Sequence, residues 1–205
     1  MPELPAGYLA PLPLQRPVGL RRRRLPAGTE MWRIDDSPPN AWTWHGFPAP
    51  RYRFDPASGA FRVRYAGGTM IGAFREKYRD SGLFLPADHA GHHFVRLVAS
   101  RDLRVLDLRN ERNLDVLGVD DQISTGHHPA VWTACHQLAD AVHAWWDDLD
   151  AIVYRPRTTP ATSVNIAFFA TDPFLTDSST LAEAGELLAE VVLHHGFTVG
   201  WNLTG

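Results

Sequence analysis

The sequence of 205 residues has very little cysteine and no long apolar run. Its one cysteine, Cys135, excludes an intramolecular disulfide and suits a reducing compartment. No apolar run reaches the roughly 18 residues that a membrane-spanning helix needs, and the N-terminus carries no charged-then-apolar signal pattern. We therefore expect a cytoplasmic protein that does not contact a membrane.

Charge of one sign is not in large excess either, because the formal net charge is −3. Such a balance gives no overall attraction to nucleic acid, and we expect no direct nucleic-acid binding. The four arginines at residues 21–24 favour a solvated charged segment over a phosphate or nucleic-acid contact.

Common catalytic motifs are missing as well. There is no GxSxG, no Walker loop and no GxGxxG, which argues against the commonest hydrolases, NTPases and dinucleotide-binding enzymes. Ten histidines are present, but three pairs are adjacent in sequence, so that their side chains diverge. His136 and His143 are seven residues apart, and no HExxH or cysteine-rich signature exists. We expect no metal site.

What the sequence does contain is enough apolar material for a folded core: hydrophobic residues make up 44% of the chain and charged residues 21%. The length favours one domain with an extension. Six of the 16 prolines fall within residues 1–28, where they prevent long regular structure. We predict a proline- and arginine-rich arm over residues 1–28 and a folded domain over residues 29–205.

Strand and helix patterns follow one another in the folded domain, which predicts the α+β class. Strand patterns cover residues 30–34, 61–66, 93–99, 103–108, 151–155, 164–169 and 197–201. Helical patterns cover residues 70–78 and 110–117, a stripe that starts at Pro129, and a segment from Thr180, with a capping box to Glu183, to Gly196. Residues 35–50 read as a loop that Trp42 and Trp44 pin to the core.

Residues 61–80, FRVRYAGGTMIGAFREKYRD, join one predicted strand to one predicted helix. Apolar and aromatic residues alternate with two arginines up to Tyr65, a glycine pair breaks the strand, and Thr69 is a helix N-cap. This turn would bring the Tyr65 hydroxyl close to the Glu76 carboxylate. A pocket wall is the functional interpretation, and a strand–turn–helix with a solvated glutamate is the simpler one.

Several segments occur in an order that resembles the RES-domain family, which is named for arginine, glutamate and serine motifs. They are an aromatic–Arg–Ile segment, an Arg–aromatic–Asp turn, a tyrosine strand before an Ala-x-x-Glu helix, and two late strands, at residues 31–34, 53–55, 63–76 and 151–168. Two positions depart from the family pattern. Asp55 replaces an asparagine, and Pro156 stands where the family serine usually falls, so that Ser163 is the next serine.

The resemblance implies a fold similar to that of ADP-ribosyltransferases, with split sheets flanked by helices around an NAD cleft. It implies NAD as the substrate, either cleaved by hydrolysis or phosphorolysis, as in toxins of toxin–antitoxin systems, or used to transfer ADP-ribose to a protein. It also implies a helix-turn-helix antitoxin as partner. A non-catalytic member that binds a nucleotide or a protein is the alternative, which Pro156 favours.

Candidate site residues follow from matching the sequence to this chemistry. Glu76 is the catalytic carboxylate, because cleavage of the nicotinamide–ribose bond develops positive charge on the ribose. Tyr65 is the second catalytic candidate, packed against the nicotinamide or the ribose. Arg33 and Arg53 are the candidates for binding the two phosphates. Further cofactor-binding candidates are Arg51, Tyr52 and Ser163.

Overall fold

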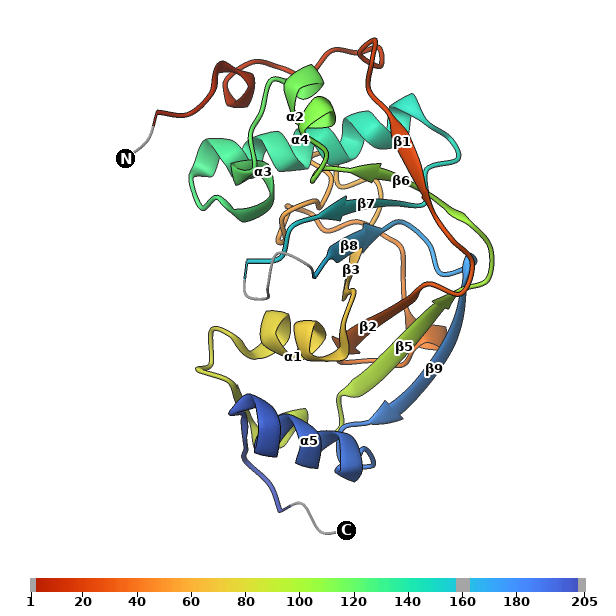
Figure 1. Ribbon diagram of the computed structural model, residues 1–205, viewed down its shortest axis with the longest axis vertical. Helices are drawn as coiled ribbons and strands as arrows, with labels where there is room; N and C mark the ends of the chain where they lie inside the picture. The colour runs from red at the N-terminus through yellow and green to blue at the C-terminus, as the bar shows by residue number, and fades with distance from the viewer. Residues whose placement is uncertain (1–2, 158–162, 203–205) are drawn as a thin grey trace.

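A computed structural model describes residues 3–157 and 163–202, and its main feature is an eight-stranded mixed sheet. The strand order is β1-β6-β7-β8-β3-β2-β5-β9. The strands are β1 (Arg22–Leu25), β2 (Glu30–Asp35), β3 (Arg64–Gly67), β5 (His93–Ala99), β6 (Leu103–Asp107), β7 (Ala151–Tyr154), β8 (Asn165–Phe168) and β9 (Phe174–Thr180). The sheet curls strongly, so that its two ends face different parts of the molecule (Figure 1).

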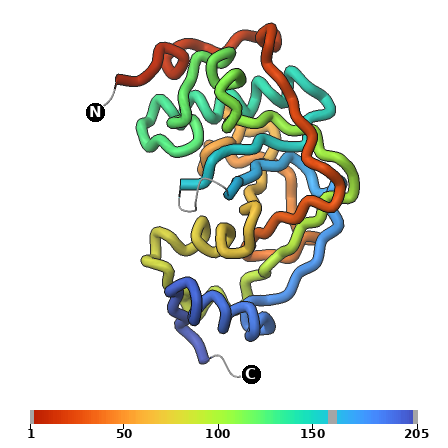
Figure 2. The backbone as a smooth tube through the Cα atoms, in the orientation of Figure 1, coloured from red at the N-terminus to blue at the C-terminus, as the bar shows by residue number. Residues whose placement is uncertain are grey.

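Helices cover the two ends of the sheet separately (Figures 1 and 2). Beside strands β1, β6 and β7 lie α2 (Glu111–Leu117), α3 (Gln122–Thr125) and α4 (Pro129–Trp145). Beside the other end lie α1 (Met70–Tyr78) and α5 (Gly185–His195), together with the small parallel pair of β4 (Phe84–Leu85) and β10 (Thr198–Val199). Single 3₁₀ turns occupy Ala6–Tyr8, Pro39–Ala41 and Ala87–His89. Among the described residues, no helix is long and apolar enough to cross a membrane.

The sheet is almost divided between β2 and β3. These strands share one residue pair, Trp32 opposite Gly67. By contrast, β2 pairs with β5 along its whole length, and β3 does the same with β8. The sheet is therefore continuous in its strand order but split in its hydrogen bonding, which agrees with the expected α+β fold of split sheets flanked by helices.

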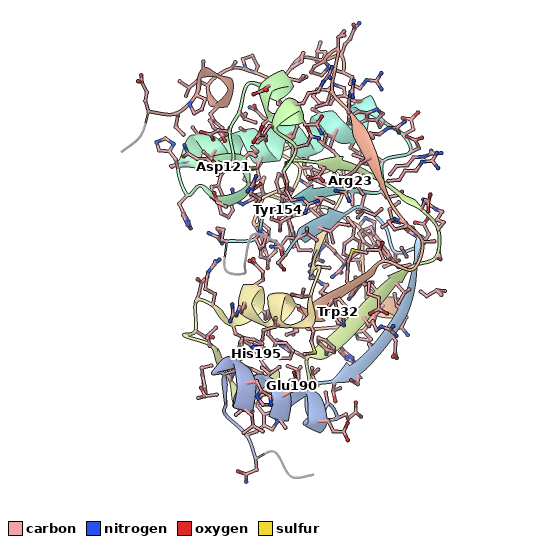
Figure 3. All side chains as sticks on the ribbon, in the orientation of Figure 1. Arg23, Trp32, Asp121, Tyr154, Glu190 and His195 are labelled. Atoms are coloured by element: carbon pink, nitrogen blue, oxygen red, sulfur yellow. The ribbon has the colours of Figure 1, made fainter. Side chains whose placement is uncertain are left out.

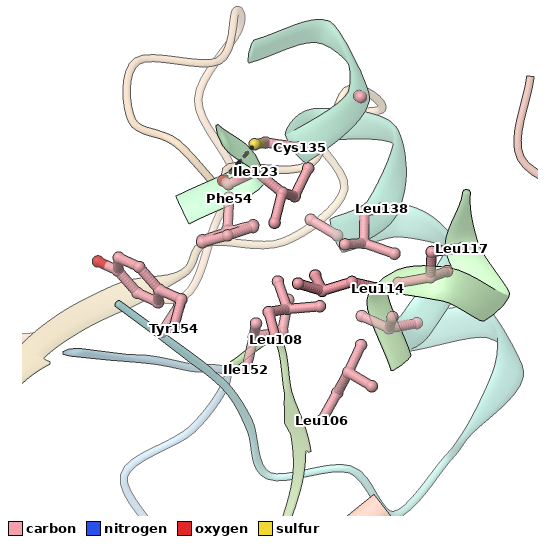
Figure 4. Close-up of a cluster of buried hydrophobic side chains, with 14 of the residues drawn as sticks. Phe54, Leu106, Leu108, Leu114, Leu117, Ile123, Cys135, Leu138, Ile152 and Tyr154 are labelled. Atoms are coloured by element: carbon pink, nitrogen blue, oxygen red, sulfur yellow. Dashed lines mark hydrogen bonds between the residues drawn. The ribbon is translucent and has the colours of Figure 1, made fainter. Parts of the chain in front are cut away.

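A core of apolar side chains holds α4 against β6 and β7 (Figure 4). The apolar stripe of α4 is buried from Val131 to Val142, as the sequence predicts. Phe54, from the loop before β3, is completely buried and packs edge-on against Tyr154 with ring centroids 5.0 Å apart. This contact ties the loop of residues 51–55 to the end of β7.

Most predicted elements are confirmed, although β3 begins at Arg64 rather than at residue 61 and the predicted strand over residues 197–201 is reduced to β10. Thr69 caps α1, its hydroxyl accepting a hydrogen bond from the Gly72 amide at 3.1 Å. Helices α2 and α5 end at Gly118 and Gly196, whose φ angles of 68° and 73° are left-handed and favour glycine. Trp42 is buried and pins the 35–50 loop, since its ring packs against Phe168 of β8 with ring centroids 6.2 Å apart.

Three further features differ from the sequence prediction. Residues 22–25, assigned to the arm, form β1 and pair with β6. Strand β9 was not predicted, because its sequence FLTDSST is mostly polar; it lies at the edge of the sheet, where exposed polar side chains are tolerated. The capping box of Thr180 and Glu183 forms its hydrogen bonds, but it encloses a turn, and α5 begins only at Gly185.

Candidate functional site

A cavity of about 610 Å³ opens where the sheet is split. Residues from both halves line it: Arg33 and Asp35 come from β2, Tyr65 from β3 and Glu76 from α1, while Tyr154 ends β7. Trp32 and Tyr154, labelled in Figure 3, mark its two sides. The lining also includes Tyr52, Arg53, Arg62, Lys77, Arg79, Ser124, Trp132, Arg157 and Asn165.

Arg33 is fixed by two contacts at the split. Its Nε donates to Asp35 Oδ2 at 2.5 Å, and its Nη1 donates to the Tyr65 carbonyl at 2.7 Å. The second contact crosses from β2 to β3. The Arg33 guanidinium also lies 5.7 Å from the centre of the Trp42 ring. A guanidinium held in this way is pre-organised for a ligand, because little side-chain freedom remains to be lost.

Arg64 is buried, although the alternating pattern placed it on the polar face of its strand. Its side chain donates from Nη1 to Asp35 Oδ2 at 2.7 Å and stacks on Trp42 at 4.5 Å. Only 2% of the residue is exposed, and burial lowers the pKa of its guanidinium to about 10. The strand is thus covered on both faces, because the loop with Trp42 and Trp44 folds over the face that a two-residue period marks as polar.

Tyr65 lines the cavity while its hydroxyl is bound to the loop of residues 51–55. The hydroxyl accepts from the Phe54 amide at 2.9 Å and donates to Asp55 Oδ1 at 3.2 Å. The other Asp55 oxygen accepts from the Arg51 and Tyr52 amides. Burial raises the pKa of Tyr65 well above its ordinary value, and the Asp55 charge adds to this shift. The phenol is therefore neutral, and its ring rather than its hydroxyl is the part offered to a ligand.

Arg53 is buried and bound to main-chain oxygens. Its Nη1 and Nη2 donate to the carbonyls of Ile123 and Gly126, at 3.1 and 2.8 Å, at the C-terminal end of α3. Its guanidinium lies 5.3 Å from the Trp132 ring centre. Within the described part of the chain, no carboxylate lies at ion-pair distance from Arg53. Arg53 therefore brings a positive charge to the cavity wall that is stabilised by carbonyl dipoles and not by an ion pair.

Glu76 lies on the α1 side of the cavity, about two turns from the Thr69 cap. It faces a part of the wall that includes Tyr154, whose pKa is raised by burial and further by the Glu76 charge. Arg157 also interacts with Glu76. Burial and neighbouring arginines lower the pKa of Arg157, and the Glu76 charge raises it. A carboxylate, a neutral phenol and a guanidinium therefore share one region of the cavity.

The remaining sequence-predicted residues are Tyr52, Arg51 and Ser163, and of these only Tyr52 lines the cavity. Tyr52 lines the cavity mouth and is 54% exposed. Arg51 does not line the cavity; its guanidinium stacks on Phe47 at 4.6 Å. Ser163 is buried 3.5 Å from the Thr69 hydroxyl, outside the cavity lining, and Pro156 is buried too.

The cavity is positive in a chain whose net charge is −3. Six arginine or lysine side chains and four carboxylates line it. Burial and the nearby Arg33 charge lower the pKa of Lys77. Within the described residues, no group of three or more histidine, cysteine, aspartate or glutamate side chains could hold a metal ion. The cavity is therefore suited to bind an anion through its arginine and lysine side chains, beside the Glu76 carboxylate.

Comparison with known proteins identifies the family of this chain. A family model described as the RES domain matches residues 30–190. This chain belongs to the RES-domain family. Among curated proteins, no sequence matches it.

A chain in the crystal structure of the M. tuberculosis MbcT–MbcA toxin–antitoxin complex has the same fold, with a TM-score of 0.54 at 15% identity. The match covers 81% of this chain and 92% of that chain. At this identity the likeness concerns the fold. The RES-domain match and the shared fold together support the predicted family and architecture.

Sequence reasoning overlooked several residues of this RES-domain cavity, namely Asp35, Lys77, Trp132, Arg157 and Asn165. Asp35 directly follows the Arg33 segment, so its carboxylate beside a strand arginine was a readable signal. Trp132 and Arg157 come from α4 and from the segment after β7, which are distant in sequence from Glu76. Only the fold brings them together.

Proposed function

We propose that this RES-domain protein cleaves the nicotinamide–ribose bond of NAD, by hydrolysis or phosphorolysis. The observation that carries the proposal is that Arg33, Arg53, Tyr65 and Glu76 line a single cavity. Its volume of about 610 Å³ lies within the usual range for small-molecule and cofactor sites.

The proposed reaction breaks the bond between the ribose C1 and the nicotinamide nitrogen. The bonding electron pair leaves with nicotinamide, which departs neutral and needs no acid. Positive charge develops on the ribose, and the Glu76 carboxylate stabilises it, as carboxylates do in glycosidic cleavage. An oxygen of water or phosphate then bonds to C1, and the proton of the acceptor passes to solvent.

The two phosphates of NAD call for fixed cations in a positive cavity. Arg33 is our main candidate because two hydrogen bonds hold its guanidinium. Arg53 contributes its charge, although two of its nitrogens already donate to carbonyls. Tyr52 and the ring of Tyr65 offer aromatic surfaces to the nicotinamide or the adenine.

A toxin that consumes NAD must be inhibited in the cell that makes it. We therefore propose a small antitoxin protein as its partner. The support is the fold shared with a chain of the MbcT–MbcA toxin–antitoxin complex. A helix-turn-helix antitoxin is the form that we expect. Transfer of ADP-ribose to a protein target, rather than to water or phosphate, uses the same bond cleavage with a different acceptor.

One observation favours a non-catalytic member of the family. Pro156 occupies the usual position of the family serine, and Ser163 does not line the cavity. A protein that has lost this hydroxyl could bind a nucleotide without cleaving it. The Thr69 and Ser163 hydroxyls are 3.5 Å apart at the N-terminus of α1, where the Thr69 hydroxyl caps the helix.

Release of nicotinamide from NAD by the purified chain, with and without inorganic phosphate, tests the proposal. Glu76→Ala should lower the rate at least about 100-fold if the carboxylate stabilises the transition state. Glu190→Ala is the matched control, because Glu190 is exposed on α5, away from the cavity, and should keep the wild-type rate.

The outcomes separate the candidate functions. Release that requires phosphate identifies a phosphorylase, and release without phosphate identifies a hydrolase. If a folded sample binds NAD but releases no nicotinamide under either condition, the enzyme proposal is wrong and the binding function takes its place. Equal rates for wild type and Glu76→Ala would remove Glu76 from the mechanism.

A further inference from the structure

One buried carboxylate, Asp35, joins two arginines at the point where the sheet is split. Asp35 Oδ2 accepts from Arg33 Nε at 2.5 Å and from Arg64 Nη1 at 2.7 Å. Its other oxygen, Oδ1, accepts from the amide and hydroxyl of Ser37 at 3.3 and 3.2 Å. The carboxylate is therefore held on both oxygens, and only 3% of the residue is exposed.

These side-chain contacts connect β2 and β3 where backbone hydrogen bonds between the two strands are largely absent. Backbone pairing between β2 and β3 is limited to Trp32 and Gly67. Two side-chain bonds cross the same gap: Arg33 of β2 donates to the Tyr65 carbonyl of β3, and Arg64 of β3 donates to Asp35 of β2. We call Arg33, Asp35 and Arg64 the clasp. It links the strand that carries Arg33 to the strand that leads into α1 and Glu76.

The charge of the clasp is not balanced internally, because two guanidiniums share one carboxylate. Arg64 is enclosed between Trp42 and Trp44, and its Nε has no hydrogen-bond partner among the described residues. Arg33 is the more exposed of the two and lines the cavity. Nη2 of Arg33 makes no hydrogen bond within the described part of the chain. An anion in the cavity could take this nitrogen and compensate the remaining charge.

We propose that Asp35 is a positioning residue for a diphosphate: it fixes the Arg33 guanidinium so that the free nitrogen serves the phosphates of the ligand. Asp35 itself repels an anion by its charge but improves binding by its geometry. These two effects have opposite signs, and this makes the proposal testable. The inference rests on the proposed function only for the choice of a diphosphate as ligand.

Binding of inorganic pyrophosphate, measured by calorimetry, is the test. Asp35→Asn increases the local positive charge, so a purely electrostatic role predicts tighter binding. A positioning role predicts binding weaker by about 10- to 100-fold, the cost of a contact displaced by about 1 Å. Asp35→Glu keeps the charge but moves the oxygens, and it should also weaken pyrophosphate binding.

Asp107→Asn is the matched control. Asp107 is also a buried carboxylate shared by two arginines, since it accepts from Arg109 and Arg23, both at 2.8 Å, but it does not line the cavity. Its substitution should change pyrophosphate affinity less than about twofold, because no contact at the cavity is displaced. Thermal melts of all three variants identify any that fail to fold, and Asp35→Glu carries the test if Asp35→Asn does not fold.

A kinetic readout adds detail where NAD is cleaved: Asp35→Asn should raise KM more than it lowers kcat, because the phosphates are remote from the bond that breaks. Unchanged or tighter pyrophosphate binding in both Asp35 variants overturns the inference, and so does a wild-type chain that does not bind pyrophosphate. A wild type that binds pyrophosphate through Asp35 but never releases nicotinamide leaves the inference standing and removes the proposed catalytic function.

Discussion

Arg62 and Arg64 are two residues apart in one sequence pattern, yet they have different environments. The Arg62 guanidinium stacks on Phe47 at 4.5 Å and reaches the cavity, while Arg64 is enclosed beside Asp35. Identical side chains therefore serve as a rim cation and as a buried ion-pair partner. The packing of the 35–50 loop, rather than residue type, decides which role each one has.

The stability of the fold should depend on pH through the Asp35 carboxyl. Burial alone would raise the pKa of the Asp35 carboxyl, but the charges of Arg33 and Arg64 hold the pKa well below its ordinary value. A carboxyl with a depressed pKa in the folded state stabilises the fold above its unfolded pKa, about 3.9. That stabilisation is lost as the pH falls below this value toward the folded pKa.

Urea unfolding of wild type and Asp35→Asn between about pH 7 and pH 3 measures this effect. The stability difference between the two proteins should be largest at neutral pH and should shrink on acidification. A difference that stays constant across the range would show that the Asp35 charge does not contribute.

The turn between β3 and α1 positions both catalytic candidates from one short segment. Gly68 leaves no room for a side chain, because a Cβ there would lie 2.5 Å from Val164 Cγ2. Thr69 then starts the helix, and Glu76 lies on its cavity side. The strand–turn–helix predicted from residues 61–80 is confirmed, and the structure adds the wall of β7 and β8 opposite it.

Removing the cap should destabilise this element. Thr69→Ala deletes the oxygen that accepts from the Gly72 amide, and we expect the free energy of unfolding to fall by about 1 kcal/mol. Thr69→Ser keeps the oxygen and should lose less. Thr133→Ala is the control, since Thr133 is exposed inside α4 and bonds only the Pro129 carbonyl. Equal losses at Thr69 and Thr133 in urea unfolding would contradict the capping role.

At the scale of the whole molecule, the N-terminal segment is integrated with the half of the sheet that carries α2, α3 and α4. Tyr8 and Leu20 are buried in the core of that half, and the Tyr8 hydroxyl donates to Asp120 Oδ1 at 2.7 Å. Strand β1 covers the edge of β6. The family match begins at residue 30, so these contacts belong to the part of the chain that precedes it.

Deleting residues 1–25 should lower the free energy of unfolding by at least about 3 kcal/mol, because two large buried side chains are lost, at about 1.5–3 kcal/mol each. The urea midpoint measures this change. Leu14→Ser should leave the midpoint unchanged, because Leu14 is 99% exposed. A truncated chain with the wild-type midpoint would show that the arm is dispensable for the fold.

The sequence by itself determined the helices, most strands and the RES-domain order of Arg33, Arg53, Tyr65 and Glu76. These depend on local periodicity, on caps such as Thr69 and on short turns, which act within a few residues of the chain. It also indicated the α+β class, because strand and helix patterns follow one another.

Only the tertiary structure decided where the sheet splits, that Arg64 is buried and that Asp35 joins two arginines. Burial depends on which segments cover a strand, and the covering loop with Trp42 lies more than twenty residues from Arg64 in the sequence. The polar strand β9 likewise forms because β5 offers it a complete set of backbone partners. Non-local pairing and packing, which no local pattern encodes, thus set the shape and the charge of the cavity.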